Sequence, residues 1–223
     1  LPTAFKKCSE LKSIDLPDSV TKLGAECFAG TGLETIDLNK VSTLTPTGTF
    51  LNCTNLTSVK MSDLSGTLPR KTFQGCSSLK KISIPAGVTT IEDTTTFSGC
   101  TALEELIIEA GSSDLNIAME QSGLSSLKKL VIDRNLTIAK NGFSGWSSDG
   151  LELTLGDNVA VVPANLTIGD STTGHIVNKI VFGKNVKTVS SKAFSGRDAV
   201  TGNNTIKMID MSALNEAPEG MDL

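Results

Sequence analysis

The sequence lacks the features of chains that span a membrane or bind nucleic acid. No run of about 18 apolar residues occurs, so no segment is expected to cross a membrane. The net charge is −4 and the pI is about 5.1, and charges of both signs are mixed along the chain without a basic tail. Because phosphate binding needs a basic patch, this charge argues against a nucleic-acid partner.

Residues suited to catalysis and metal binding are also scarce. His175 is the one histidine, and no Gly-x-Ser-x-Gly, His-Glu-x-x-His or P-loop motif accompanies it. We therefore interpret His175 as an exposed loop residue, and we expect a non-enzymatic protein that uses no cofactor. Cys-x-x-Cys is absent as well, so a zinc site is not expected.

The cysteines number five, and an odd count does not suggest a disulfide framework. Cys53, Cys76 and Cys100 share one column of the repeat described below, and Cys8 lies two units before Cys53. Neighbouring strands lie about 4.8 Å apart, so distance alone does not exclude cross-links. Side chains in one inward column run parallel and pack, however, which favours buried free thiols. A disulfide ladder or a metal site is the alternative.

What the sequence does contain is a repeat of 22 to 24 residues. Its clearest marks in the first half are phenylalanines at Phe5, Phe28, Phe50, Phe73 and Phe97. A period of this size is typical of solenoids, propellers and arrays, in which each unit buries its apolar face only against its neighbours.

Each unit carries the phrase Leu-x-x-Ile-x-Leu. The units are numbered as coils 1 to 9 by the central apolar residue of this phrase. These central positions are Ile14, Ile36, Val59, Ile82, Leu106, Leu130, Leu153, Ile180 and Ile209. Apolar residues alternate with one outward position there, which is the period of a strand with one buried face. A second short apolar pair, such as Val88 and Ile91, predicts an extended return side. The sequence thus predicts a β-rich solenoid of about nine coils of 22–29 residues, with a parallel sheet and few short helical turns.

The longer phrase Phe-x-x-Cys-x-x-Leu-x-x-Ile-x-Leu-Pro-x-x-Val-x-x-Ile is almost complete over residues 73–91. It resembles the BspA-like (Treponema-type) leucine-rich repeat family, closely over residues 5–108 and more weakly beyond. We therefore expect residues 1–223 to form a single solenoid domain, regular over 1–108 and irregular with corner insertions over 109–223. The resemblance implies a bacterial or protist surface or secreted protein, often an adhesin, and implies no defined site.

The second half departs from the phrase at its phenylalanine corner. Met119 and Leu166 are expected to replace the phenylalanine, and Thr31, Trp146 and Arg197 to occupy the cysteine position. Extra residues enter at 145–150, 168–175 and 197–205. All three insertions fall between the corner and the next strand, so these loops should lie on one edge of the solenoid.

Two columns of residues are expected to point outward beside the central positions. The column before them alternates in sign: Lys81, Glu105, Lys129, Glu152 and Lys179. Opposite charges on neighbouring strands contribute about 0.2–1 kcal/mol per pair, so a ladder that fixes register is the favoured interpretation. The column after them becomes aliphatic at Ile107, Val131 and Val181. β-Branched residues suit any strand, but apolar residues grouped on an exposed face also mark partner sites.

The favoured hypothesis for function is an adhesin-like recognition module that binds a host or extracellular-matrix protein. A stalk that presents another domain is the alternative, and a carbohydrate-binding surface module is a weaker one. The candidate partner-binding residues are Ile107, Val131, Val181, Trp146, His175 and Arg197. Function tends to lie on loops carried by a rigid scaffold, and tryptophan is enriched at binding hot spots. Trp146 filling a widened corner is an equally favoured interpretation.

Overall fold

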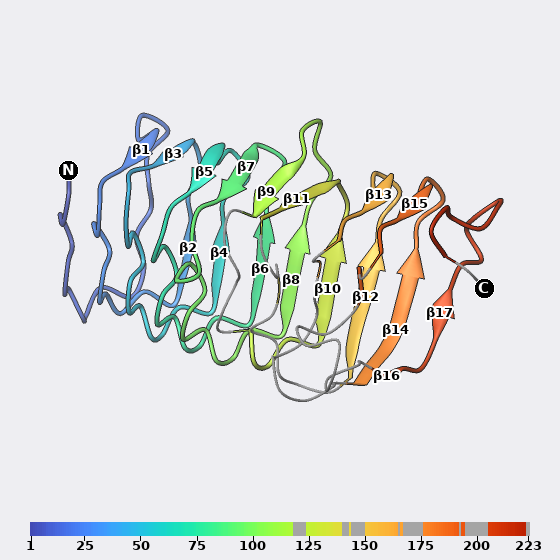
Figure 1. Cartoon of the computed structure of the whole chain (residues 1–223). Helices are drawn as coiled ribbons and strands as arrows, with labels where there is room; N and C mark the ends of the chain where they lie inside the picture. The colour runs from blue at the N-terminus through green and yellow to red at the C-terminus, as the bar shows by residue number, and fades with distance from the viewer. Residues whose placement is uncertain are drawn as a thin grey trace.

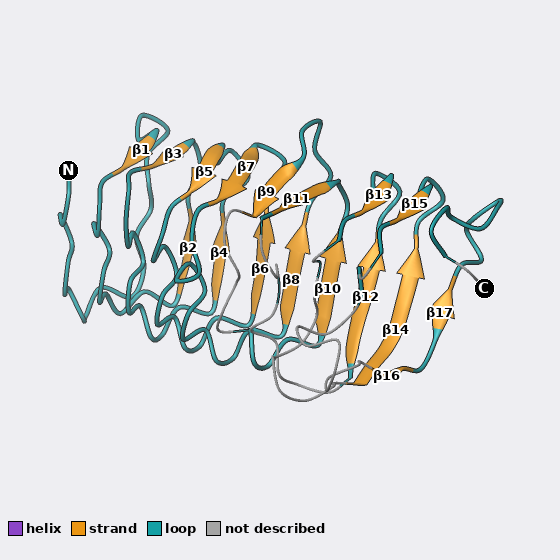
Figure 2. Ribbon diagram, viewed as in Figure 1, coloured by secondary structure: helices purple, strands orange, loops and turns teal. Residues whose placement is uncertain are grey.

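Short parallel strands, stacked coil upon coil, build an elongated solenoid in the computed structural model of the chain (Figures 1 and 2). The structure describes residues 1–117, 124–139, 143, 150–164, 166, 176–191, 193–194 and 205–221. Within these residues there is no helix, so the turns that join the strands are single turns and bends. The parallel-strand solenoid predicted from the repeat is confirmed.

Two sets of strands lie on opposite sides of the core, and we call them the front strands and the return strands. The front strands are β2 (Thr35–Asp37), β4 (Ser58–Lys60), β6 (Lys81–Ile84), β8 (Glu105–Ile108), β10 (Lys129–Ile132), β12 (Leu151–Leu155), β14 (Ile176–Phe182), β16 (Thr205–Ile206) and β17 (Ile209–Asp210). The return strands are β1 (Lys22–Leu23), β3 (Thr43–Leu44), β5 (Gly66–Leu68), β7 (Val88–Ile91), β9 (Leu115–Ile117), β11 (Leu136–Ile138), β13 (Val161–Val162) and β15 (Thr188–Val189).

The front strands do not form the one continuous sheet that the repeat predicted. Strands β6, β8, β10, β12, β14 and β16 follow one another in a sheet that β17 joins at β14, whereas β2 and β4 pair only with each other. Ile14 of coil 1 lies in no strand, so strands cover eight of the nine central positions among the described residues. The expected count of nine coils is therefore slightly off, although the solenoid itself is as predicted.

A proline lies at the break between β4 and β6. In later coils, the residue after the front strand donates its N–H to the last strand residue of the preceding coil, as Glu109 does to the Ile84 carbonyl at 3.0 Å. Asp133, Gly156 and Gly183 repeat this bond at 2.9, 2.7 and 2.6 Å. In coil 4 this position is Pro85, which has no N–H to donate. The ladder bond to Met61 therefore cannot form.

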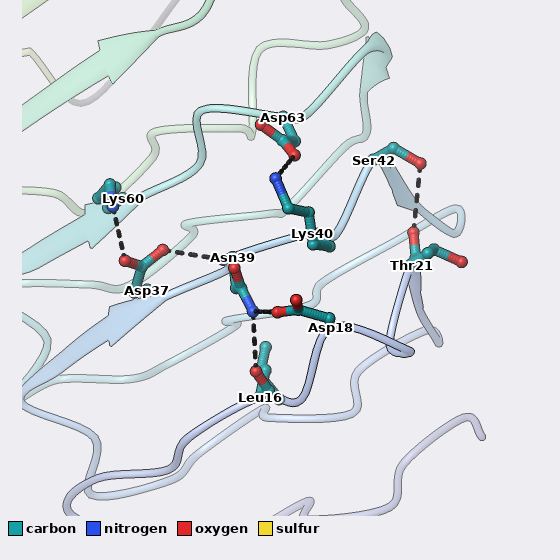
Figure 3. A network of polar contacts seen from close by, with 9 residues as sticks. All are labelled: Leu16, Asp18, Thr21, Asp37, Asn39, Lys40, Ser42, Lys60 and Asp63. Atoms are coloured by element: carbon teal, nitrogen blue, oxygen red, sulfur yellow. Dashed lines mark hydrogen bonds and ion pairs between the residues drawn. The ribbon is translucent and has the colours of Figure 1, made fainter.

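An asparagine side chain replaces the same ladder bond between coils 1 and 2 (Figure 3). Asn39 has a φ of 49° and donates its own N–H to Asp37 Oδ1 at 2.8 Å. Its side-chain Nδ2 instead donates to the Leu16 carbonyl at 3.2 Å and to Asp18 Oδ1 at 2.6 Å. At this position coil 1 is thus held by a side chain where coils 5 to 8 are held by backbone.

The core of the first five coils is organised by a stack of phenylalanine rings at one corner. Neighbouring rings of Phe5, Phe28, Phe50, Phe73 and Phe97 have centroids 5.3, 5.8, 5.7 and 6.0 Å apart. Their planes differ by only 3–5°, so the rings stack in parallel within the range of favourable aromatic pairs.

Backbone hydrogen bonds run along the same corner although no strand is assigned there. Phe50 N donates to the Thr72 carbonyl at 2.9 Å, and two positions on Asn52 N donates to the Gln74 carbonyl at 2.7 Å. Asn52 adopts a φ of 58°, and Gly75 one coil later a φ of 77°. A positive φ favours glycine at this corner, and a Cβ on Gly75 would lie 2.3 Å from Asn52 Oδ1, although Asn52 itself and Lys7 adopt a positive φ at the same position of earlier coils.

Candidate interaction surface

The solvent-facing side of the front strands, which we call the front face, carries a ladder of alternating charges. Lys81, Glu105, Lys129, Glu152 and Lys179 lie in register on neighbouring strands, as the sequence predicted. Glu105 pairs with both neighbours, and its carboxylate oxygens lie 2.9 Å from Lys81 Nζ and from Lys129 Nζ. Asp210 on β17 is the register partner of Val181 in the neighbouring column, and its carboxylate lies 2.8 Å from Lys179 Nζ.

The aliphatic column, Ile107, Val131 and Val181, lies beside this ladder on the same face. Ile107 is the register partner of Val131, and Val131 is followed by Thr154 and then Val181. All three aliphatic side chains are half-buried between their neighbours. The column therefore offers a shallow apolar stripe bordered by charges rather than a pocket.

Hydrogen-bonded ion pairs hold the pKa of the Glu105 and Asp210 carboxyls below their ordinary values. For Glu105 the largest cause is the hydrogen bond from Lys81; burial opposes it, and Lys129 adds a further lowering. The pKa of Asp210 is lowered first by Lys179 and then by Ser212, whose hydroxyl and N–H both donate to its carboxylate. At neutral pH the Glu105 and Asp210 carboxylates are therefore ionised and paired with lysines of the ladder.

Three of the six candidate binding residues are not among the residues that the structure describes. Trp146, His175 and Arg197 fall outside the described residues, as does Met119. The insertions at 168–175 and 197–205 lie outside them too, apart from Thr205 in β16, and only Gly150 of the insertion at 145–150 is described. The structure therefore brings together Ile107, Val131 and Val181, and the predicted cluster of loops stays a prediction.

Two substitutions at the corner fit the expected positions, and a third was missed. Thr31 is buried in the cysteine position, with its Oγ1 3.3 Å from Cys53 Sγ. Leu166 is buried, as expected of a residue that replaces the phenylalanine. Leu124 occupies the cysteine position before Leu127, which donates its N–H to the Leu124 carbonyl at 3.1 Å. Its spacing of three residues from Leu127 was the available signal.

The cysteine column consists of buried free thiols, as predicted. Cys53, Cys76 and Cys100 donate through Sγ to the carbonyls of Phe28, Phe50 and Phe73, at 3.0, 3.2 and 3.1 Å. All five cysteines are free, and Cys8 alone is exposed. Burial raises the pKa of Cys27 to about 11 and that of Cys100 to about 12. These thiols pack the core and show no sign of being activated nucleophiles.

Two further features were not predicted from the sequence: a second charge column and the loop at residues 109–114. Lys80, Glu104 and Lys128 adjoin the first ladder, and Lys128 Nζ lies 2.8 Å from Glu104 Oε1. Doubled charges in the sequence, such as Lys80 followed by Lys81, were the signal for this column. The loop at residues 109–114 gave no such signal because it leaves the period of the repeat unchanged.

Two hollows in the described surface lie where the front sheet is interrupted, and one of them, of about 150 Å³, lies between β4 and β6. The other, of about 360 Å³, lies between coil 1 and β2 and is lined by Ser13, Ile14, Asp15, Leu16, Thr35, Ile36, Asp37 and Asn39. No group of three or more His, Cys, Asp or Glu side chains among the described residues is arranged to hold a metal ion. Over the same residues, no helix has the length and apolar character needed to cross a membrane.

Comparison with known proteins places the repeat in a family. The sequence model of a family described as "BspA type Leucine rich repeat region" matches residues 2–104 and 43–170, with six copies. A leucine-rich repeat protein from Bacteroides ovatus, known from its crystal structure, is 19% identical, with a TM-score of 0.45. That alignment covers 95% of this chain and 72% of the other. No curated protein matches the chain.

Proposed function

Because this chain belongs to the BspA-type leucine-rich repeat family, we propose that it is a recognition module of a bacterial surface or secreted protein. Its partner on this proposal is a host or extracellular-matrix protein, bound without catalysis. Leucine-rich repeat domains generally mediate protein interactions and are typically non-enzymatic, and BspA-type proteins are commonly found at the surface or secreted. These family properties support the proposal in outline, and the front face supports it in detail.

The observation that carries the proposal is the composition of the front face. Five in-register strands, β6 to β14, give a regular surface about 20 Å across at the usual strand spacing. The aliphatic column runs through it, and the charge ladder borders it on one side. Interfaces combine an apolar centre with a polar rim in this way.

A stalk that presents another domain is the second candidate, favoured by the polar bridges that join successive coils. Lys40 pairs with Asp63 one coil later at 3.0 Å, and Lys184 pairs with Asp157 at 3.1 Å (the first pair is drawn in Figure 3). Such bridges stiffen the solenoid whatever it binds. A stalk has no need of an aliphatic column on its surface, so substitution there distinguishes the two functions. A carbohydrate-binding module is the remaining alternative and predicts glycan binding instead.

The test is binding of the soluble chain to immobilised fibronectin, laminin and collagen on a surface sensor, with albumin as the negative surface. For a matrix protein that binds, Val131→Lys should weaken affinity by about tenfold or more, since it places a charge in the apolar centre of the interface. Ser58→Lys on β4 is the matched control and should change affinity by less than about twofold. Trp146→Ala tests the corner loops in the same assay.

Two outcomes would contradict this proposal. Equal affinity of Val131→Lys and Ser58→Lys for a bound matrix protein would remove the aliphatic column from the interface. Loss of binding on substituting Asp15 or Asp37, with Val131→Lys and Trp146→Ala both unaffected, would move the site to the N-terminal coils. Absence of binding to all three matrix proteins would favour the stalk.

A further inference from the structure

Coil 5 has a longer connection between its front strand and its return strand than its neighbours do. Leu115 follows Ile108 by seven positions, whereas Val88 follows Ile84 by four and Leu136 follows Ile132 by four. The extra residues stand out from the solenoid as a loop between β8 and β9 (Figure 1). Residues 109, 110 and 112–114 of this loop are exposed.

The space under the loop is filled by an arginine from the next coil. Arg134 is only 1% exposed and is the largest fully buried side chain of the described core. Its Nη1 donates to the carbonyls of Ala86 and Val88 at 2.9 and 2.8 Å, and its Nη2 donates to the Pro85 carbonyl at 2.9 Å. The guanidinium therefore reaches past coil 5 and binds the corresponding connection of coil 4.

The loop is built around this guanidinium. A Cβ added to Gly111 would lie 2.9 Å from Arg134 Nη1 and 3.1 Å from the Ala86 carbonyl oxygen, so the backbone of residue 111 packs directly over the buried group. Both ends of the loop are fixed by backbone bonds. Glu109 N donates to the Ile84 carbonyl and Leu115 N to the Asn135 carbonyl, each at 3.0 Å.

A buried guanidinium is costly unless its donors are satisfied, because desolvation of the charge is not otherwise compensated. Here three carbonyls accept from Nη1 and Nη2, whereas the buried Nε has no hydrogen-bond partner among the described residues. The nearby Glu109 carboxylate opposes the lowering of the Arg134 pKa by burial. A connection of ordinary length in coil 5 would occupy the same space with its own backbone. The burial of Arg134 and the outward position of the loop therefore depend on each other.

We propose that Arg134 is a clamp that fills the space under the long connection of coil 5 and holds residues 109–114 outward as a preformed surface loop. The loop borders the front face, because Glu109 accepts a hydrogen bond from Ser83, whose register partner is Ile107. A loop held in one conformation loses little entropy when a partner contacts it. This inference does not depend on the proposed function, since it concerns the fold of the free protein.

The test is a cycle between Arg134→Ala and deletion of residues 111–113, which restores the connection length of coils 4 and 6. Arg134→Ala alone should lower the melting temperature by about 5 °C or more, as expected for loss of a buried charged partner from a chain of this size. The deletion alone should also lower it, because the shortened connection competes with the guanidinium for the same space. In the Arg134→Ala background, the deletion should instead raise it.

Lys128→Met in the same coil removes an exposed charge and is the control, with an expected shift below about 2 °C. A spin label at Ser113→Cys, in a Cys8→Ser background, should report an ordered loop that becomes mobile in Arg134→Ala. Destabilisation by the deletion in both backgrounds would overturn the proposal. So would a label whose mobility is the same with and without Arg134.

Discussion

The first and second halves of this solenoid join their coils by different means. In coils 2 and 3, where the repeat phrase is regular, the front strands have three residues each and pair only with each other. Front strands lengthen to four residues in coils 4–6, five in coil 7 and seven in coil 8. The parallel stack of phenylalanine rings shows the opposite trend and runs from Phe5 to Phe97. In coil 8 the described ring pair, Phe182 and Phe194, meets edge to face at 79°.

This contrast shows that the coils can be coupled at either of two places. In the first half, rings, thiols and corner backbone bonds join the coils at the corner and tolerate a front sheet interrupted at Pro85. In coils 4 to 8, front strands of four or more residues supply the ladder. The following predictions test whether the two halves also differ in which of these contacts stabilise them.

Ile82→Asp should have the largest effect on stability, because it places an unpaired carboxylate in the core where both means of coupling meet. Ile82 is 1% exposed on β6, the first strand of the seven-stranded sheet. A loss of more than about 4 kcal/mol in the free energy of unfolding is expected, measured by urea titration with far-UV circular dichroism. Ile209→Asp is the control; at 40% exposure it should cost less than about 1 kcal/mol. Equal losses would mean that the end coils are as tightly coupled as the centre.

Phe73→Ala should cost about 3–5 kcal/mol, since it removes a fully buried ring and both of its stacking contacts. Phe5→Ala, at the end of the stack and 38% exposed, should cost about 1 kcal/mol. Hydrogen exchange should open chiefly in coils 3 to 5 of Phe73→Ala, because each coil contacts only its neighbours. If Phe182→Ala proves as costly as Phe73→Ala, the parallel stack does not distinguish the two halves.

Most of the fold follows from sequence columns, because every coil repeats the same contacts. The strand positions, the register of the charge ladder and the buried thiols were all predictable from the spacing of single residues such as Ile82, Glu105 and Cys76. The break in the front sheet was predictable in principle, since Pro85 lacks the N–H that the ladder needs there. The repeat pattern alone does not indicate this break, because it predicts a strand in every coil and a neighbour on both sides of each strand.

The clamp at Arg134 could not be read from the repeat. Its loop adds three residues between Ile108 and Leu115, but Leu127 follows Ile117 by ten positions where Leu103 follows Ile91 by twelve. The gain and the loss nearly cancel, so the spacing of the central positions stays at 24 in both coils. An arginine in a connecting segment is also expected to be exposed, whereas the structure shows that Arg134 has three carbonyl partners two coils away.

Alkaline pH should weaken the first half selectively, because Cys27, Cys53, Cys76 and Cys100 all lie in it. Burial raises the pKa of Cys27 to about 11 and of Cys100 to about 12, and raises those of Cys53 and Cys76 as well. An unfolded thiol has a pKa of about 8.5. The contribution of each thiol to stability is therefore fully present below about pH 8.5 and is lost as the pH rises toward the folded value.

The expected slope is up to about 1.4 kcal/mol per pH unit for each thiol, measured by urea titration between about pH 8 and 10.5. Cys76→Ser is the control, because its hydroxyl can still donate to the Phe50 carbonyl but does not titrate in this range. In that variant the pH dependence of the free energy of unfolding should fall by the contribution of one thiol. At neutral pH a thiol reagent should modify Cys8 rapidly and the other four only in denaturant; fewer than five thiols in denaturant without reductant would reveal a disulfide.

Glu105→Gln should give the smallest effect and tests whether the charge ladder holds the second half together. Glu105 joins Lys81 and Lys129 across three strands, and its side chain is 21% exposed. Partly exposed ion pairs contribute about 0.2–1 kcal/mol each, so a total loss of about 1 kcal/mol is expected, less at high salt. Because its pKa is lowered in the folded state, this contribution is present above the unfolded value of about 4.3 and is lost as the pH falls through the folded value. A double-mutant cycle with Lys81→Met isolates one pair. A coupling of zero in that cycle would show that strand length alone joins the later coils, and that the ladder only fixes which residues face one another.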